Sequence, residues 1–404
     1  MPQHFDALVV GGGPGGATAA LALAGAGWSV ALVECRAFPR RKVCGEYLSL
    51  TNWPLFERLG LADAFSRLAG PEISQVALMS GATTLVSELP RAGANGAAWG
   101  RALSRERLDT LLVDAARRAG VDVRQPARVV AWERTRGGHA CQVLADEQGD
   151  VRELHATIVV AAHGSWETGP LATQPTRMPP RDADLLGFKA HFHHSRLAEG
   201  LMPLLSFADG YGGMVHCEGG RVSFSCCLRR DRLESLRRQP GESAGDAVFE
   251  YVLSACPAVR EVVDASRRDG PWLAAGPIRP GIRRRYHDGV FVVGNAAGEA
   301  HPVVAEGISM AMQSAWLLGR RLAADGRVRS RRSRDEAMVD SAGRDYAALW
   351  RHTFAGRIRA AAAVAHWAMR PAAVRAVLPI IRRCPALLTW GARLSGKSRL
   401  LVDS

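Results

Sequence analysis

The chain has 404 residues, of which 47% are hydrophobic and 23% are charged, and its net charge at pH 7 is +13. These values are ordinary for a globular protein, and the length allows two domains with a sizeable core. The eight cysteines form no CxxC pair and no zinc spacing, and no secretory leader is recognisable. We therefore expect reduced thiols, no structural disulfide and a cytoplasmic location.

The first predicted unit is a strand, a glycine turn and a helix within FDALVVGGGPGGATAA, residues 5–20. Residues 7–33 are uncharged and mostly apolar, but the run of glycines would break a membrane helix in its first third. We predict a buried strand over residues 5–10, a helix of small residues over 17–26 and a second strand over 29–33.

The glycine turn has the GxGxxG spacing of a dinucleotide-binding motif in Gly11, Gly13 and Gly16, with Pro14 and Gly15 inside it. The first glycine permits the tight turn, the second lets a pyrophosphate approach the backbone, and the third lets the helix pack against the strand. Amides at the start of the helix would face the anion. Glu34, at the end of the second strand, stands where an acid accepts hydrogen bonds from an adenosine ribose.

The middle of the chain predicts an antiparallel sheet that would carry the substrate. Residues 186–193 alternate apolar and polar side chains, and residues 213–228 have the pattern of two strands joined by a turn. His191 and His193 would project from one face, but no carboxylate or cysteine follows at ligand spacing, so we predict no metal site. Residues 281–285, GIRRR, are predicted to form a solvated loop between the domains.

A strand over residues 289–293 precedes GNAAGEAHPVVAEGISMAMQSA, residues 294–315. Here Gly294, Asn295, Pro302 and Gly307 are followed by a helix of small residues that begins at Ile308. This order resembles the second FAD motif of the para-hydroxybenzoate hydroxylase and geranylgeranyl reductase group of flavoproteins. The resemblance implies that Asn295, where the group carries Asp, bonds the ribityl chain. It also implies that the helix directs its positive end at the flavin ring.

The resemblance extends over residues 1 to about 330. SRERLDTLLVDAARRAG looks like the group's RxxLD helix, in which Arg105 would lie near the FAD pyrophosphate, and Val129 stands where the group often touches adenine. His163 replaces the acid of an Asp-Gly pair implicated in flavin and nicotinamide contacts. Because no second GxGxxG unit is present, NADPH or NADH would reach the flavin only transiently.

Two further segments are similar to the same group. In CRAFPRRKVCGEYLS, the basic residues Arg36, Arg40, Arg41 and Lys42 form either a solvated face or a group from which Arg41 and Lys42 reach the FAD phosphates. KVCGE is similar to the cysteine-glycine loop of geranylgeranyl reductases, which makes Cys44 a candidate active-site residue. DGYGGMVH, residues 209–216, stands where related reductases carry YxWxFP and flavin halogenases carry WxWxIP. We expect Tyr211 and His216, at the first and last positions of that signature, to contact substrate.

These motifs predict an α/β protein with a Rossmann-type FAD-binding domain, an inserted antiparallel β-sheet substrate domain and a C-terminal helical segment. We assign residues 1–75, 101–170 and 281–330 to the FAD-binding domain and residues 76–100 and 171–280 to the substrate domain. Residues 331–404 form a predicted basic helical region.

The basic region has two interpretations. Residues 327–404 hold 16 Lys and Arg against 5 Asp and Glu, and Tyr346, Trp350 and Phe354 recur at helical spacing. Such a helix can cap the substrate domain, or it can lie peripherally on the inner face of the membrane. No nucleic-acid-binding module accompanies the charge, so we expect no nucleic-acid partner.

The first functional hypothesis is a monooxygenase of secondary metabolism. NADPH or NADH would reduce FAD, the reduced flavin would capture oxygen as a C4a-hydroperoxide, and an aromatic or polyketide-like lipophilic molecule would be hydroxylated. The alternative is a geranylgeranyl-reductase-like enzyme that reduces C=C bonds in a prenyl or polyketide chain. A flavin halogenase and a non-catalytic, membrane-associated flavoprotein are the remaining interpretations. Candidate side chains for proton transfer, chosen because acid-base groups must lie within reach of the ring, are His163, His301, Glu299 and Glu306. Cys44 is a further catalytic candidate, on the resemblance of its loop.

Overall fold

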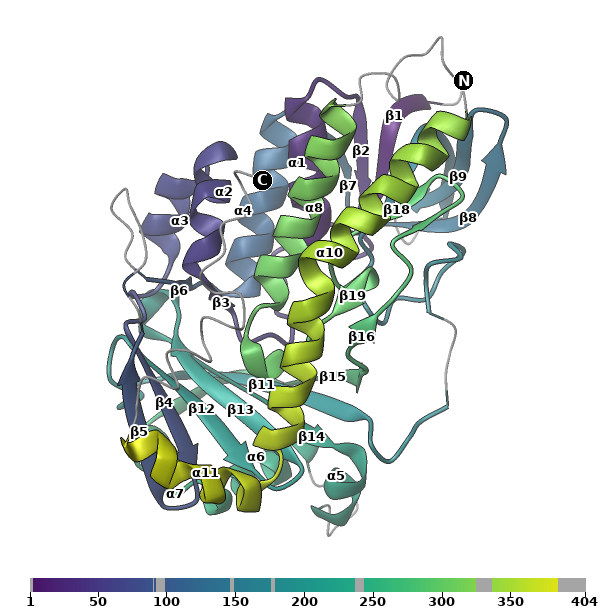
Figure 1. The fold of residues 1–404 in the computed structure, drawn as a ribbon. Helices are drawn as coiled ribbons and strands as arrows, with labels where there is room; N and C mark the ends of the chain where they lie inside the picture. The colour runs from purple at the N-terminus through teal and green to yellow at the C-terminus, as the bar shows by residue number, and fades with distance from the viewer. Residues whose placement is uncertain are drawn as a thin grey trace.

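The computed structural model describes residues 3–89, 91, 99–145, 149–175, 179–236, 243–324 and 336–383. Two large β-sheets organise these residues, and helices pack on both of them (Figure 1). The predicted fold class is confirmed: a Rossmann-type sheet, a second and mostly antiparallel sheet, and a C-terminal helical segment.

The first sheet carries the dinucleotide motif. Its strands, in spatial order, are β17 (Tyr286–His287), β18 (Val290–Val292), β10 (Asp150–Ala161), β1 (Gln3–Val10), β2 (Val30–Val33) and β7 (Asp122–Arg124), with β9 (Gly138–Ala145) on β10 and β8 (Ala127–Thr135) on β9. β1 runs parallel to both β2 and β10. Ala7, Leu8 and Val9 are therefore fully buried, as expected for a central parallel strand covered on both faces.

The second sheet has the strand order β15 (Arg267–Ile278), β11 (Leu185–His193), β14 (Val222–Arg229), β13 (Gly210–His216), β12 (Leu201–Phe207), β4 (Gln75–Ser80) and β5 (Thr83–Glu88). All neighbours are antiparallel except β12 and β4, which are parallel. The predicted antiparallel sheet therefore contains one parallel pair, β12 with β4. The chain reaches β12 from β4 through a long connection that crosses the first sheet, and long connections are what parallel pairs require.

Helices and short ladders complete the described part of the chain. The α-helices are α1 (Pro14–Gly25), α2 (Trp53–Arg58), α3 (Ala62–Leu68), α4 (Arg105–Arg118), α5 (Arg230–Leu236), α6 (Ala244–Ala255), α7 (Pro257–Val263), α8 (Gly307–Ala324), α10 (Glu336–Ala368) and α11 (Pro371–Arg383). Short 3-10 turns are η1 (Leu50–Asn52), η2 (Glu218–Gly220), η3 (Gly294–Ala296) and η4 (Pro302–Val304). β3 (Tyr47–Leu48) pairs with β6 (Arg101–Ala102), and β16 (Gly281–Ile282) pairs with β19 (Gly298–Glu299).

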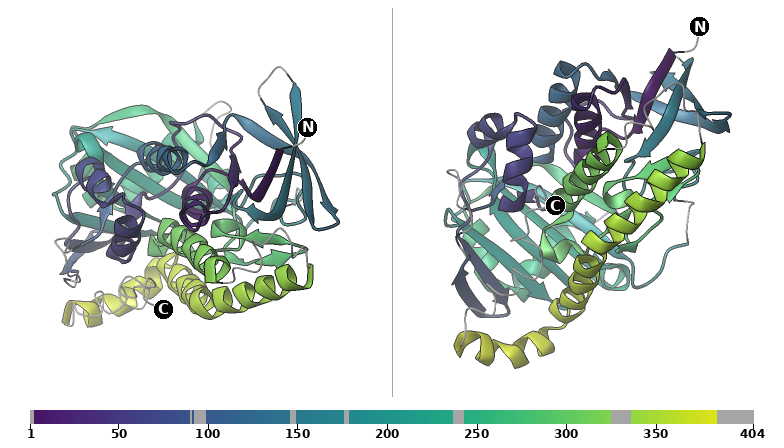
Figure 2. Two further views of the ribbon diagram at one scale, coloured as in Figure 1. Left: turned by 90° about the horizontal axis from the view of Figure 1, so that it is seen from above. Right: turned by 45° about the horizontal axis from the view of Figure 1, so that its top comes forward.

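Small residues bring the two motif helices together. α1 and α8 lie side by side in both views of Figure 2. A Cβ on Gly319 of α8 would lie 2.5 Å from the Cβ of Ala22 on α1, so glycine is needed for this approach. At the other end, a Cβ on Gly15 would lie 3.4 Å from the carbonyl oxygen of Ala311. The amino ends of both helices therefore lie close together.

The two faces of β11 are both buried, but against different partners. Phe188, Ala190 and Phe192 belong to a core that includes residues of α6 and α7. Lys189 and His191, on the opposite face, are 0% and 2% exposed. The sequence pattern of alternating residues predicted one apolar face, and the structure shows that the polar face is covered as well.

The C-terminal helices pack against the body of the protein. Most of the predicted apolar stripe of α10 is buried, namely Tyr346, Trp350, Phe354, Ile358 and Ala361, whereas Leu349 and Val364 are 38% and 47% exposed. α10 runs along the molecule from the first sheet toward the second, where α11 contacts β4 and β12 (Figure 1). No helix among the described residues is long and apolar enough to cross a membrane. The remainder of the predicted basic region, residues 384–404, lies outside the described residues.

Candidate active site

A cavity of about 530 Å³ lies between the two sheets, and residues of both glycine-rich motifs line it. Gly13, Pro14 and Gly15 line one part, and Gly294, Asn295, Pro302, Gly307 and Ile308 line another. Strands of the second sheet supply Tyr211, Met214 and Cys227. The structure thus brings together the two motifs, which the sequence separates by almost 300 residues, around one space.

The first motif has the geometry that a dinucleotide turn requires. Gly11 has φ +109°, and a Cβ there would lie 2.5 Å from the carbonyl oxygen of Ala162. A Cβ on Gly16 would lie 1.8 Å from the carbonyl oxygen of Gly11. At Gly13 the nearest atom to such a Cβ would be a guanidinium nitrogen of Arg105 at 3.6 Å, so this glycine leaves its backbone open to the cavity.

Glu34 closes this turn from the adjacent strand. Its carboxylate accepts hydrogen bonds from the backbone N–H of Gly12 at 2.8 Å and of Arg36 at 2.9 Å. Arg40 lies 3.6 Å from the same carboxylate. The acid is 3% exposed and borders the turn instead of lining the cavity.

Of the three basic residues predicted to contact the FAD phosphates, two line the cavity and one does not. Lys42 and Arg105 line the cavity. Arg105 donates two hydrogen bonds to Asp109, at 2.7 and 2.6 Å, and burial together with Arg105 and Arg40 lowers the pKa of Lys42. Arg41 does not line the cavity, because it forms ion pairs with Glu106 at 3.2 Å and Asp269 at 2.8 Å.

Val129 is also outside the cavity lining. It belongs to β8 and is 4% exposed within the main core. Its predicted contact with adenine therefore stays a prediction.

The second motif is held in place by a network that the sequence did not reveal. The side-chain amide of Asn295 donates to Glu299 at 3.1 Å, and Arg283 bonds both Glu299, at 3.0 Å, and the backbone carbonyl of Asn295, at 2.6 Å. The predicted solvated loop at residues 281–285 is shorter in the structure, because residues 281–282 form β16, which pairs with β19. The Arg283 side chain is 30% exposed beside Glu299. Gly294 has φ +63°, so a glycine is favoured at the start of this motif.

His163 lines the cavity, but both of its ring nitrogens are engaged. Nδ1 lies 2.9 Å from the carbonyl oxygen of Gly164, and Nε2 lies 3.3 Å from the hydroxyl of Thr173. Since a carbonyl oxygen only accepts, Nδ1 carries the proton and Nε2 accepts from Thr173. Burial lowers the pKa of His163 to about 4, so the ring is neutral at pH 7. This arrangement holds the ring in place and leaves no free nitrogen for proton transfer.

Tyr211 and His301 form a pair at the edge of the cavity. The Tyr211 hydroxyl lies 3.2 Å from Nδ1 of His301, which is behind it and does not line the cavity. Burial lowers the pKa of His301 to about 4. Burial and the neighbouring Cys227 raise the pKa of Tyr211 well above its usual range. His301 is therefore neutral at pH 7 and can act as a hydrogen-bond partner of the Tyr211 hydroxyl.

Two other predicted residues lie away from the cavity lining. His216 donates from Nε2 to the backbone carbonyl of Leu197 at 2.8 Å, so its ring is fixed within the second sheet. Glu306 is 1% exposed at the start of α8, where Ser49 donates to its carboxylate at 3.3 Å. Burial and the charge of Glu306 raise the pKa of Tyr47, which does line the cavity.

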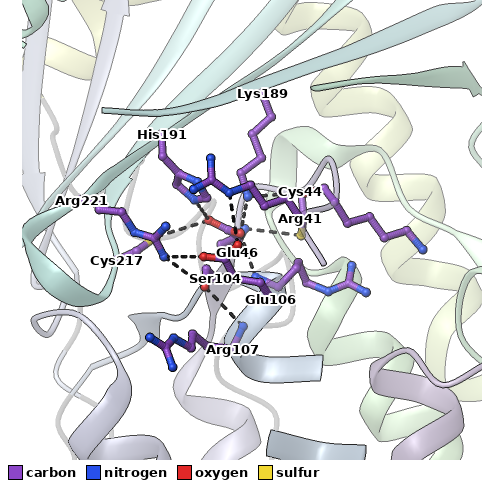
Figure 3. Close-up of polar contacts among 12 residues, drawn as sticks. Arg41, Cys44, Glu46, Ser104, Glu106, Arg107, Lys189, His191, Cys217 and Arg221 are labelled. Carbon is purple, nitrogen blue, oxygen red and sulfur yellow. Dashed lines mark hydrogen bonds and ion pairs between the residues drawn. The ribbon is translucent and has the colours of Figure 1, made fainter. Parts of the chain in front are cut away.

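Cys44 lines the cavity next to a buried cluster that sequence reasoning missed. Figure 3 shows the side chains of Lys189, His191 and Cys217 directed at Glu46, with Cys44 close by. All four are at most 2% exposed. One weak signal was present in the sequence, the unusual lysine and histidine within the apolar strand β11, but their carboxylate partner lies on a loop far away in the chain.

The part of the cavity on the second sheet is mainly apolar. Its lining there includes Met202, Leu204, Met214, Val215 and Ile278, and Val303 of η4 lines the cavity as well. Gly213 also lines it, and a Cβ at this glycine would meet only the carbonyl oxygen of Pro203, at 3.1 Å, within 4 Å. The site therefore offers space and apolar surface for a lipophilic molecule next to the two motifs.

One family model matches most of the chain. The family is described as FAD binding domain, and the match covers residues 4–341.

The chain is similar to proteins that are named as a receptor, a reductase and a monooxygenase. The chain is 23% identical over 334 residues to conditioned medium factor receptor 1 of Dictyostelium discoideum, a match that covers 78% of this chain and 62% of that receptor, less than two thirds of its length. It is 28% identical over 357 residues to digeranylgeranylglycerophospholipid reductase 1 of Methanothermobacter thermautotrophicus, covering 82% and 81% of the two chains. It is 26% identical over 319 residues to 6-methylpretetramide 4-monooxygenase of Streptomyces rimosus, covering 77% and 73%.

Solved structures show the same fold. The myxobacterial chondrochloren halogenase superposes with a TM-score of 0.77 at 22% identity, covering 100% of this chain and 92% of the halogenase. A geranylgeranyl bacteriochlorophyll reductase-like protein from Thermoplasma acidophilum superposes with a TM-score of 0.65 at 17% identity, covering 89% and 85%. At these identities the similarity concerns the fold alone.

Proposed function

The chain belongs to the FAD binding domain family and is an FAD-dependent oxidoreductase, and from this premise we propose that it hydroxylates a neutral, lipophilic aromatic molecule with NADPH or NADH as reductant. The observation that carries the proposal is a cavity that joins the two FAD motifs to an apolar wall of the second sheet.

The residues present fit FAD. Side chains at Gly11 and Gly16 would collide with backbone oxygens, and Gly13 leaves room for a pyrophosphate beside the amino end of α1. Arg105 and Lys42 would hold the phosphates, and Asn295, oriented by Glu299, would hold the ribityl chain. The amino end of α8 would face the flavin ring. The bound cofactor supplies the electrons for oxygen activation or for reduction of a double bond.

The Tyr211–His301 pair would orient a phenol in the cavity. A phenolic hydroxyl next to Tyr211 would hydrogen-bond to the Tyr211 hydroxyl, which lies 3.2 Å from Nδ1 of His301. Burial lowers the pKa of His301 to about 4, so its ring stays neutral and holds this hydrogen bond without taking up the proton. The apolar wall, with Leu204, Val215 and Ile278, would exclude water from the reacting ring.

A second candidate function is reduction of a C=C bond in a prenyl or polyketide chain. Met202, Met214, Cys44 and Cys227 line the cavity. Thiols and thioethers are oxidised by activated oxygen, whereas a reduction leaves them unchanged. The similarity to a digeranylgeranylglycerophospholipid reductase also favours this candidate.

The test uses full-length protein reconstituted with FAD. NADPH oxidation is followed with a long-chain alkylphenol and with geranylgeraniol, in air and without oxygen, and products are analysed by mass spectrometry under ¹⁸O₂. Hydroxylation predicts oxygen-dependent incorporation of one labelled atom into the phenol. Reduction predicts a gain of two hydrogens that needs no oxygen. A protein that fails to bind FAD would contradict both candidates.

A further inference from the structure

Lys189 is a fully buried lysine on the face of β11 that points toward the FAD-binding domain. Its ammonium forms an ion pair with the Glu46 carboxylate and lies 3.4 Å from the backbone carbonyl of Lys42. One cation thus contacts both ends of the Lys42–Glu46 segment. A buried ammonium is stable only when it is paired and hydrogen-bonded in this way.

The Glu46 carboxylate has four polar partners. It accepts from the backbone N–H of Arg105 at 2.8 Å, from Nε2 of His191 at 2.8 Å and from the thiol of Cys217 at 3.4 Å, in addition to Lys189 (Figure 3). Burial alone would raise the pKa of Glu46, but Lys189 and His191 outweigh burial and hold that pKa below its ordinary value. The carboxylate is therefore ionised at neutral pH.

The segment that Glu46 anchors forms part of the cavity wall. Lys42, Cys44 and Gly45 line the cavity, and the backbone N–H of Glu46 lies 3.4 Å from the sulfur of Cys44. Glu46 itself has φ +63°, a left-handed conformation that is unfavourable for a non-glycine residue. The contacts of its side chain with the second sheet offset that cost.

We propose that Lys189 and His191, through Glu46, are positioning residues that hold Lys42 and Cys44 against the bound FAD. The second sheet thereby controls the flavin-facing loop as well as the substrate wall. This inference rests on the proposed function, because it takes FAD to occupy the cavity.

The cluster also has the composition of a metal site. Candidate ligand atoms of Glu46, His191 and Cys217 lie within 4.8 Å of one another. Lys189 already places a positive charge on the Glu46 carboxylate, and a divalent cation beside that ammonium would be repelled. A positioning role therefore accounts for the cluster without a metal ion.

The experiment measures how fast iodoacetamide alkylates Cys44, by peptide mass spectrometry, in FAD-loaded protein. FAD affinity, the visible flavin spectrum and thermal stability are recorded on the same samples. The variants are Lys189→Met, which leaves Glu46 with one partner fewer, and Lys189→Met/Glu46→Gln, which removes both charges. Arg279→Met is the matched control, since it removes the cation from Asp184, another buried carboxylate at the edge of the same sheet, at 2.6 Å. Cys44→Ser defines the background signal.

In both Lys189 variants we expect alkylation of Cys44 to be about tenfold faster and the flavin spectrum to shift, because the loop opens locally. The double variant should regain most of the thermal stability that Lys189→Met loses, since no buried charge is left unpaired. Arg279→Met should lose stability without a change at Cys44.

Three outcomes would overturn the proposal. One is alkylation and spectra within twofold of the unaltered protein in both Lys189 variants. Another is a double variant that regains both stability and protection of Cys44, because the ion pair would then act on stability alone. The third is a slower alkylation on addition of Zn²⁺ that EDTA reverses, which would assign the cluster to a metal. If unaltered protein binds no FAD, the proposed function fails instead, and the alkylation rates without FAD still test whether Lys189 holds the loop.

Discussion

At the scale of single residues, the absence of a side chain is as important in this site as any functional group. Gly11, Gly13 and Gly16 each leave space that a Cβ would fill, but for different reasons. Gly16 lies against a backbone oxygen that cannot move aside, whereas Gly13 borders the space where a pyrophosphate would lie. Substitutions at different glycines therefore distinguish an effect on the backbone fold from an effect on the space for the cofactor.

Gly16→Ala should weaken FAD binding by about 100-fold, or about 2.7 kcal/mol, because its Cβ would lie 1.8 Å from the carbonyl oxygen of Gly11. Titration of FAD, followed by flavin fluorescence, measures the effect. The control is Gly25→Ala at the end of the same helix, where a Cβ would meet no atom within 4 Å. That control should bind FAD normally and gain up to about 1 kcal/mol of stability. Equal affinities in the two variants would contradict the role given to Gly16.

Gly213→Trp should fill the apolar part of the cavity. The expected result is unchanged FAD affinity and a loss of at least about tenfold in turnover of long-chain substrates. Gly213→Ala, which adds one methyl group, should have a much smaller effect on the same reaction. If Gly213→Trp turns over such substrates at the normal rate, the molecule that reacts does not bind beside β13.

At the scale of elements, α10 behaves as part of the body of the protein. Tyr346 donates a hydrogen bond to the backbone carbonyl of Val292 at 2.9 Å, and a Cβ on Gly298 would lie 2.5 Å from the ring of Trp350. The helix therefore supports β18 and β19, the strands that precede and carry the second motif. The apolar side chains of α10 that are buried against the protein are not accessible to a lipid bilayer.

Trp350→Ala should destabilise the protein by about 3–5 kcal/mol, because it empties a site in which the indole is 1% exposed. Leu349→Ala, on the neighbouring and 38% exposed position, should cost less than about 1 kcal/mol. Chemical denaturation with and without FAD measures both changes. Similar losses in the two variants would mean that α10 does not pack as described.

The sequence predicted those elements whose signal is local. The turn from Gly11 to Gly16 and the helix that begins at Gly307 were recognisable because spacing within a few residues determines their geometry. The Glu46 cluster was not recognisable, since His191 and Glu46 are 145 residues apart and an isolated polar residue in a strand usually faces solvent. The contacts of Arg283 with Asn295 and Glu299 were not recognisable either, since they depend on the pairing of β16 with β19.

At the scale of the whole molecule, the buried histidines should make stability depend on pH. Burial lowers the pKa values of His139, His163 and His301 from 6.5 to about 4. Below pH 6.5 the unfolded chain therefore binds protons that the folded protein does not, and stability falls as the pH drops from 6.5 toward 4. Glu46 acts in the same direction at lower pH, because its lowered pKa gives stability that is lost on acidification below about 4.5.

His139→Asn isolates one of these contributions. His139 is 2% exposed, and its Nδ1 accepts a hydrogen bond from the indole N–H of Trp132 at 3.2 Å, which an asparagine oxygen can also accept. Between pH 6.5 and 5 the variant should lose up to about 1.4 kcal/mol per pH unit less than the unaltered protein. His194→Asn, at an exposed histidine, is the control and should follow the unaltered protein. Urea denaturation at three pH values provides the comparison, and parallel curves for all three proteins would contradict the assignment.

The path of the chain between the sheets has a practical consequence. β4 and β5 precede α4, whereas the other strands of the second sheet follow β10, and the two groups share a ladder through β12 and β4. No single cut in the backbone can therefore release either sheet intact. An engineer who wishes to exchange the substrate-binding portion for that of a relative would have to transplant two separate gene segments together, since either one alone would end in an open β-edge.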